Sequence, residues 1–165
     1  MQLLFVPIEE HDIELMLPLY NHYVRETTAT LQEGEVDALA MRARLFPDYP
    51  RFDSWKIVVD GRPCGYVSLT RYKISTVYDA TAEVSIFLDP AWPGKGVGTQ
   101  ALAFVEYRAR ERQFHSLIAV ICAENIGSIR LFQKQGYVQC AHCHDVAKKF
   151  GRWLDVLMFE KLLSD

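Results

Sequence analysis

The chain has 165 residues, half of them apolar, with 18 basic and 21 acidic side chains and a formal net charge of -3. This length suits one domain, 1–165, whose hydrophobic core needs no disulfide bonds, and the weakly acidic balance argues against nucleic acid as a partner. The chain has neither a basic signal region near Met1 nor an apolar run approaching the roughly 20 residues of a membrane span, so we expect a cytoplasmic protein with no membrane partner.

The N-terminal part predicts a strand followed by two helices. The strand is expected at residues 2–8, and apolar residues recur at helical spacing from residue 13 to about 24, with Asp12 as the expected N-cap. A polar loop at 26–34 separates this helix from a second amphipathic helix at 36–46.

Three strands are expected next. Residues 55–59 and 64–72 flank Asp60-Gly61, a dipeptide typical of tight hairpin turns, so these strands should pair antiparallel. A further strand spans 81–88. In the second half of the chain, helices are expected at 98–112 and at 125–135, where Gly136 ends the second helix. Strands are expected at 117–122, which should be buried, at 137–143 and at 153–159.

This order predicts a mixed α/β fold. The helix at 98–112 would join the strands at 81–88 and 117–122 as a right-handed parallel crossover, while the other strands pair antiparallel.

A glycine-rich turn lies between the strand at 81–88 and the helix that follows it. Glycine at alternate positions lets a ligand approach the backbone, and the first N–H groups of the helix have no internal acceptor. This turn therefore predicts a phosphate-binding site. Its residues are Gly94, Lys95, Gly96, Val97, Gly98 and Thr99.

Several phosphate ligands fit a turn of this kind. A nucleoside triphosphate loop is excluded because Lys95 precedes Gly96 instead of following the last glycine. Gly96, Gly98 and Ala101 do match the dinucleotide fingerprint, with Glu124 placed as a ribose-binding acid. However, such a turn follows the first strand of its fold, whereas 93 residues precede Gly94, so the dinucleotide remains an alternative beside coenzyme A.

Cysteine and histidine residues gather between Cys140 and His144. The run spells C-x-x-C-H, a haem-attachment pattern that also offers soft metal ligands. Successive residues of a strand point to opposite faces, so these side chains cannot all reach one ion. We expect a buried strand with reduced thiols and no metal site.

The central part of the chain resembles the GNAT acyltransferase superfamily. The strand from Glu83, the glycine turn and the long helix lead to a second strand and then to Asn125, Ser128, Phe132 and Gly136-Tyr137 in the order and spacing of that superfamily. The resemblance implies a splayed central sheet flanked by helices and a coenzyme A cleft.

A closer resemblance, to the phosphinothricin and methionine sulfone N-acetyltransferases, covers nearly the whole chain. The most specific motif is the run from Lys149 to Val156, and further matches are Tyr20-Asn21, Thr27-Thr28-Ala29, Val36-Asp37 and Gly65-Tyr66. Enzymes of this subgroup transfer acetyl from acetyl-CoA to the α-amine of a small amino-acid analogue, and relatives often form homodimers.

Two residues depart from the superfamily pattern. Pro93 replaces the usual Gln or Arg and lacks an N–H, so backbone donors from Gly94 to Thr99 would have to suffice. Phe132 replaces the Tyr that protonates the leaving thiolate in many members, and a phenyl ring donates no proton.

Glu83 is the candidate catalytic base. Its neighbours along the strand are largely apolar, so desolvation should raise the pKa of its carboxyl group toward values useful for accepting a proton from an ammonium group. The alternative is a structural acid paired with Arg or Lys.

The resemblance implies roles for further residues. Backbone groups of Ile86, Phe87 and Leu88 would bind the pantetheine arm and polarise the thioester oxygen, and Asn125 would reach the pantetheine or cap its helix. Lys73 could hold the acceptor's carboxylate. The full expected acceptor site is Lys73, Ile74, Ser75, Glu83, Val84 and Ser85.

Two other functions remain open. A protein N-terminus or lysine could be the acceptor, although the loops at 26–34 and 72–80 favour a closed pocket. Phe132 and Pro93 would also suit an acyl-CoA sensor that binds without turnover.

Overall fold

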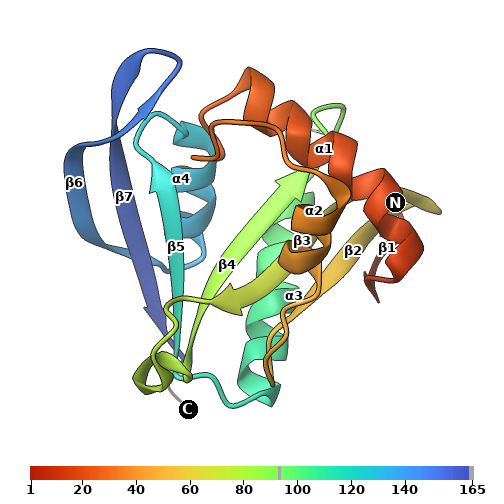
Figure 1. Ribbon diagram of the computed structural model, residues 1–165. Helices are drawn as coiled ribbons and strands as arrows, with labels where there is room; N and C mark the ends of the chain where they lie inside the picture. The colour runs from red at the N-terminus through yellow and green to blue at the C-terminus, as the bar shows by residue number, and fades with distance from the viewer. Residues whose placement is uncertain (93, 164–165) are drawn as a thin grey trace.

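A seven-stranded mixed sheet forms the centre of the computed structural model, which describes residues 1–92 and 94–163 (Figure 1). The strand order is β1-β2-β3-β4-β5-β7-β6. The expected mixed α/β fold class is confirmed. The strands are β1 (Leu3–Pro7), β2 (Asp53–Val59), β3 (Arg62–Arg71), β4 (Thr81–Leu88), β5 (Ser116–Cys122), β6 (Val138–Lys149) and β7 (Arg152–Leu162).

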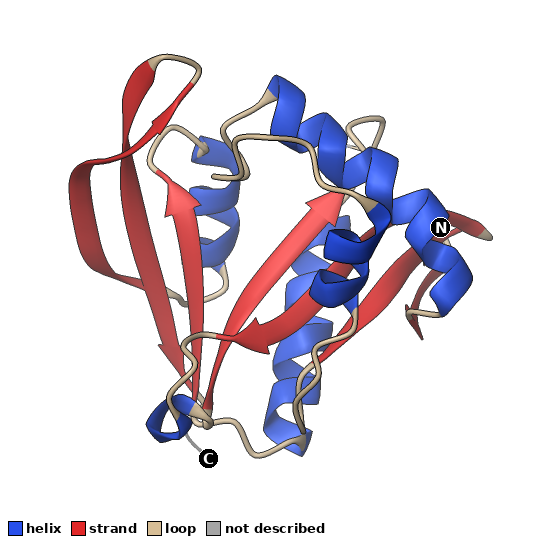
Figure 2. Ribbon diagram, in the orientation of Figure 1, coloured by secondary structure: helices blue, strands red, loops and turns tan. Residues whose placement is uncertain are grey.

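Helices cover both faces of this sheet, as Figure 2 shows. One face carries α1 (Ile13–Glu26) and α2 (Ala38–Leu45), and the other carries α3 (Val97–Glu111) and α4 (Ile126–Lys134). Short 3-10 turns at Glu10–Asp12 and Thr76–Tyr78 precede α1 and β4. All the expected helices and strands are present, with ends shifted by a few residues and a longer β6.

The larger part of the core lies between the sheet and α3. The predicted apolar stripe of this helix is confirmed, because Val97, Ala101, Leu102, Val105 and Ala109 are each at most 1% exposed. Burial of such a stripe is the main source of stability for an amphipathic helix. A second cluster on the opposite face joins α1 and α2 to the sheet, through Met16, Tyr20, Val24, Met41, Leu45 and Tyr66.

The sheet splits between β4 and β5. The two strands run parallel and pair at three positions, of which the last joins Glu83 to Ile118. Beyond Glu83, β4 stays paired with β3 as far as Leu88, but no described strand pairs with its other edge. Figure 1 shows the two arrows diverging from a common foot. The expected parallel crossover and the splayed sheet are therefore confirmed.

The predicted turns have the expected backbone conformations. Asp60 and Gly61 both have positive φ values, 47° and 77°, as the tight hairpin between β2 and β3 requires. Gly136 has a φ of 85°, the left-handed conformation that ends α4.

Asp12 occupies the N-cap position of α1, as expected, but its side chain does not cap that helix. Its side chain makes no capping hydrogen bond to α1, and instead accepts hydrogen bonds from the backbone N–H of Glu9 and from Lys56 Nζ, at 2.9 and 2.7 Å. Asp12 is fully buried, and a buried carboxylate needs a cationic partner more than a helix end needs a cap. The ion pair between α1 and β2 therefore decides its orientation.

The burial expected for residues 140–144 is also wrong. Cys140, Cys143 and His144 are exposed, because β6 is the outermost strand of the sheet and only β7 flanks it. Both cysteines are free thiols, as expected.

Candidate active site

The glycine turn lines a cavity of about 400 Å³ at the N-terminus of α3. All six predicted turn residues from Gly94 to Thr99 border it, whereas Pro93 lies outside the described residues. Gly96 is the N-cap of α3 with a φ of 72°, and no heavy atom of the described residues lies within 4 Å of the position that a Cβ would occupy. The turn is therefore open for a ligand.

Backbone donors of α3 face this cavity. The helical hydrogen bonds begin with Gln100 N–H and Gly96 O, so the N–H groups of Val97, Gly98 and Thr99 have no helical acceptor. Such groups carry the positive end of the helix dipole.

Cationic side chains from two elements line the same cavity. Lys95 comes from the turn, and its Nζ lies 4.6 Å from the ring centroid of Trp92. Arg130 and Lys134, which the sequence analysis missed, reach the cavity from α4. Their spacing of four residues on the predicted helix at 125–135 was the available signal.

A second cavity, of about 260 Å³, occupies the split between β4 and β5. Ile86, Phe87 and Leu88 line it from β4, as expected for pantetheine-binding groups. Both cavities share Tyr23, Leu88, Gly127 and Leu131, so together they form one groove from the glycine turn into the sheet. Tyr23, also missed from the sequence, donates a hydrogen bond from its hydroxyl group to Leu88 O.

Asn125 caps α4, as one of its two expected roles requires. Its side-chain oxygen accepts a hydrogen bond from Ser128 N–H at 3.2 Å, which caps α4, and the residue also lines the cavity in the split. Phe132 lines the same cavity, is 4% exposed, and packs edge-on against Tyr137.

Glu83 lies where the split begins. It lines two cavities on the α1 and α2 side of the sheet, of about 360 and 290 Å³, and Ser85 and Phe87 line both of them as well. Burial raises the pKa of the Glu83 carboxyl group, and the nearby positive charge of Arg44 counteracts part of that increase. Among the described residues, Glu83 has no ion-pair partner within 4.0 Å.

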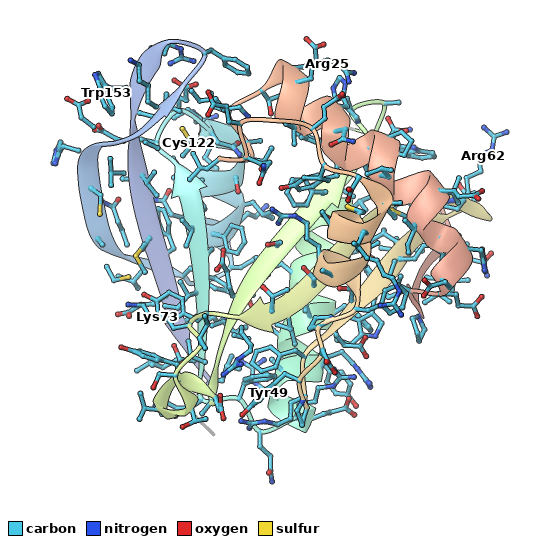
Figure 3. All side chains as sticks on the ribbon, viewed as in Figure 1. Arg25, Tyr49, Arg62, Lys73, Cys122 and Trp153 are labelled. Atoms are coloured by element: carbon cyan, nitrogen blue, oxygen red, sulfur yellow. The ribbon has the colours of Figure 1, made fainter. Side chains whose placement is uncertain are left out.

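Of the remaining acceptor candidates, Ser85 shares both cavities with Glu83, whereas the three on the loop at 72–80 do not. Lys73, Ile74 and Ser75 lie on the loop between β3 and β4 and line neither cavity that contains Glu83. Figure 3 shows Lys73 near the foot of the sheet, whereas Cys122, which lines one of these cavities, lies at the far end of β5. Val84 lines the cavity in the split, and Ser85 lines that cavity together with both Glu83 cavities.

The loop at 26–34 closes the smaller Glu83 cavity. Ala29, Thr30, Leu31 and Gln32 form one wall of it, and Ala29 also borders the cavity in the split. This loop therefore lies over the junction between the two parts of the groove. Arg44 of α2, which was not predicted from the sequence, adds a cation to both Glu83 cavities.

Three side chains of types that can bind a metal ion lie close together on the exposed C-terminal hairpin. Side-chain atoms of His142, His144 and Asp155 lie within 4.8 Å of one another, and His142 Nε2 is 2.7 Å from Asp155 Oδ2. Asp155 also accepts a hydrogen bond from the backbone N–H of Asp145. The alternation of the strand explains why His142 and His144 share a face while Cys143 does not.

Residues 16–137 match the Acetyltransferase (GNAT) family, and the chain belongs to this family of N-acetyltransferases. The predicted enzyme class and the predicted resemblance are thereby confirmed. In the part of the chain that the structure describes, no helix is long and apolar enough to cross a membrane.

Three proteins similar to this chain carry names of N-acetyltransferases with different acceptors. The chain is 32% identical to an L-methionine sulfoximine/L-methionine sulfone acetyltransferase of Salmonella typhimurium, over 95% of this chain and 92% of that protein. It resembles the phosphinothricin acetyltransferase of Sinorhizobium meliloti, solved in complex with AcCoA, with a TM-score of 0.93 and 25% identity, covering 99% and 90% of the two chains. A ribosomal-protein-alanine N-acetyltransferase of Brucella melitensis matches with a TM-score of 0.87 and 33% identity, covering 97% and 99%.

Proposed function

We propose that this protein transfers the acetyl group of acetyl-CoA directly to the α-amine of a small amino-acid-type acceptor, in the manner of the methionine sulfone and phosphinothricin acetyltransferases. One observation carries the proposal: Ser85 and Phe87 border both the cavity in the split and the cavities that contain Glu83. A thioester in the split would therefore lie beside a carboxylate that can accept a proton.

The residues of the groove suit coenzyme A. The open turn at Gly96, the free N–H groups at the start of α3 and the cations Lys95, Arg130 and Lys134 would hold the phosphates. The edge of β4 from Ile86 to Leu88, with which β5 does not pair in the described part of the chain, would hydrogen-bond the pantetheine arm.

Glu83 would act as the general base. Because burial raises the pKa of its carboxyl group, Glu83 is a stronger base than an exposed glutamate and would take the proton from the acceptor's ammonium group. The free amine then attacks the thioester carbon, the new C–N bond forms, and the C–S bond breaks. A backbone N–H of Phe87 or Leu88 would stabilise the oxyanion.

The leaving thiolate needs its own source of protons. Phe132 cannot supply one, so we propose that a water molecule in the groove takes the second proton that the nitrogen loses as the amide forms, and passes it to the thiolate. Water can bind in the groove because Tyr23 and Ser128 add polar groups to its lining.

A protein acceptor is the second candidate. The Brucella relative is named as acting on an alanine of a ribosomal protein, whose α-amine would react by the same chemistry. The loop from Ala29 to Gln32 favours the small acceptor, because it walls the Glu83 cavity where a peptide would have to leave. A sensor without turnover is the third candidate.

Release of coenzyme A thiol distinguishes these candidates. The purified protein is incubated with acetyl-CoA and, separately, with methionine sulfone, phosphinothricin and a peptide that begins with alanine. The proposal predicts fast thiol release with a free amino acid and slow release with the peptide. The reverse order supports the protein acceptor, and binding of acetyl-CoA without release under any condition supports a sensor.

We further propose that the enzyme forms a homodimer in the cytoplasm. The outermost strand β6 exposes Val138 and Val146, at 65% and 57%, which gives a second copy an apolar edge to pair with. Light scattering on a size-exclusion column measures the mass, and a monomer at micromolar concentration would contradict the dimer.

A further inference from the structure

We propose that Arg44 binds the carboxylate of the acceptor, so that the acceptor class is the α-amino acids, which carry an ammonium and a carboxylate group together. This inference rests on the proposed function and adds to it the residue that selects the acceptor. It also places carboxylate recognition on α2, although the sequence analysis expected it from Lys73.

Arg44 borders the acceptor space together with the candidate base. It lines both cavities that contain Glu83, and its neighbours there include Ser85 and Phe87. The carbon atom of its guanidinium group lies 4.5 Å from the ring centroid of Tyr20. Tyr20 is only 1% exposed, so the ring is a fixed surface that orients the guanidinium group.

The guanidinium group is free to bind a ligand. Within the described ranges, Arg44 has no carboxylate within 4.0 Å, and its side chain donates no hydrogen bond. Arg42 on the same helix is different, because its Nε donates to Glu10 Oε1 at 2.8 Å. A guanidinium group without a partner retains paired donors that match a carboxylate.

The two charges suit an amino acid. Glu83 presents a negative group and Arg44 a positive group to the same cavities, which is the complement of a zwitterion. Arg44 also holds down the pKa of Glu83, which burial raises. A bound carboxylate would offset the charge of Arg44 and leave Glu83 a stronger base when the acceptor is present.

Lys73 is less well placed for this role. It lies on the loop between β3 and β4, and its Nζ is 5.4 Å from the ring centroids of Tyr72 and of Tyr78. It lines neither cavity that contains Glu83.

Matched acceptors test the contact. Methionine sulfone and its primary carboxamide have the same side chain and α-amine, but only the first has a carboxylate. Thiol release from acetyl-CoA is measured with both acceptors for the wild type, Arg44→Ala, Arg44→Lys and the control Arg42→Ala.

We expect Arg44→Ala to lower kcat/KM for methionine sulfone about tenfold more than for the carboxamide, mainly through KM. Arg44→Lys should fall between Arg44→Ala and the wild type because it keeps the charge but loses the paired donors. Arg42→Ala removes a charge from the same helix and should behave as the wild type. The KM for acetyl-CoA should not change in any variant.

An equal loss with both acceptors would overturn the proposal, because Arg44 would then act on Glu83 or on the fold. If the wild type acetylates neither acceptor, the proposed function fails. Calorimetric binding of methionine sulfone to the wild type and Arg44→Ala still tests the contact in that case. Equal affinities, or no binding to either, would overturn it, and circular dichroism checks that each variant is folded.

Discussion

Lys149 donates a hydrogen bond of 2.7 Å from its buried Nζ to the carbonyl oxygen of Thr30. A second bond of 2.7 Å runs from the same Nζ to the carbonyl oxygen of Thr27. The C-terminal hairpin is thereby tied to the loop that walls the acceptor cavity, across more than a hundred residues of sequence. Lys149 belongs to the run from Lys149 to Val156 by which the chain resembles its subgroup, so part of that motif has a structural role.

Replacing Lys149 by methionine should destabilise the protein by about 2 kcal/mol, because two buried carbonyl groups lose their donor. The loosened loop should also raise the KM for the acceptor. Urea unfolding and acceptor kinetics measure the two effects. The control is Lys148→Met, because Lys148 is exposed, and a change below about 0.5 kcal/mol is expected there. Equal stability of the two variants would contradict this role.

Glu124 is hydrogen-bonded to the same loop through Thr28. Arg152 donates two hydrogen bonds of 2.7 Å to its carboxylate, and Thr28 donates one from its hydroxyl group. The bonds from Arg152 and then from Thr28 lower the pKa of Glu124 to about 2. A carboxyl group whose pKa is lowered on folding contributes stability above its unfolded pKa, near 4.5, and loses that contribution as the pH falls toward 2.

The variant Glu124→Gln tests this linkage. At pH 7 it should be less stable than the wild type by at most about 1 kcal/mol, because the side chain is partly exposed and solvent screens the pair. The difference should shrink between pH 4.5 and pH 2. Unfolding free energies in urea at several pH values give the comparison, and a difference that does not vary with pH would contradict the shifted pKa.

Replacing Glu83 by glutamine should lower turnover near neutral pH by about 100-fold or more and leave the affinity for acetyl-CoA nearly unchanged. The wild-type rate should rise with pH through the raised pKa of Glu83, and that rise should be absent in the variant. Glu35→Gln, at an exposed residue that pairs with Arg25, is the control. An unchanged pH–rate profile would remove Glu83 from the mechanism.

Glu83→Gln should also alter stability. A carboxyl group whose pKa is raised on folding favours the folded state only at low pH, and this advantage is lost as the pH rises through the folded pKa. The melting temperature of the variant should therefore rise relative to that of the wild type as the pH increases above the ordinary pKa of 4.5.

Replacing Gly96 by valine should abolish binding of acetyl-CoA, because a side chain would fill the open turn. Gly61→Val is a matched control, since Gly61 has a similar φ of 77° in a hairpin away from the groove, also with no atom near a Cβ. Both variants should lose about 1–2 kcal/mol of stability through backbone strain. Only Gly96→Val should lose affinity in calorimetry, and retained affinity would contradict a ligand at this turn.

Local patterns predict the fold well where one physical requirement dominates. The apolar stripe of α3 has only one face to bury, and Asp60-Gly61 suits the two positive φ values of its turn. Alternate glycines indicate the turn, and the alternation of the strand indicates which side chains lie on the same face as Glu83.

Competition between requirements explains the failures. Asp12 could cap a helix or pair with Lys56, and only the folded structure shows that its burial favours the ion pair. Cys140 lies in an apolar run, yet its strand is the last of the sheet, and on one side no strand of the described residues pairs with it. Arg44 was missed because nothing local distinguishes a free arginine from a paired one such as Arg42.

A crystal structure with acetyl-CoA tests the central claim most directly. We predict the diphosphate at the backbone N–H groups from Gly94 to Thr99, the pantetheine arm along β4 in the split, and the thioester next to Glu83. A groove left empty at saturating acetyl-CoA, or a pantetheine arm bound anywhere else, would contradict the account.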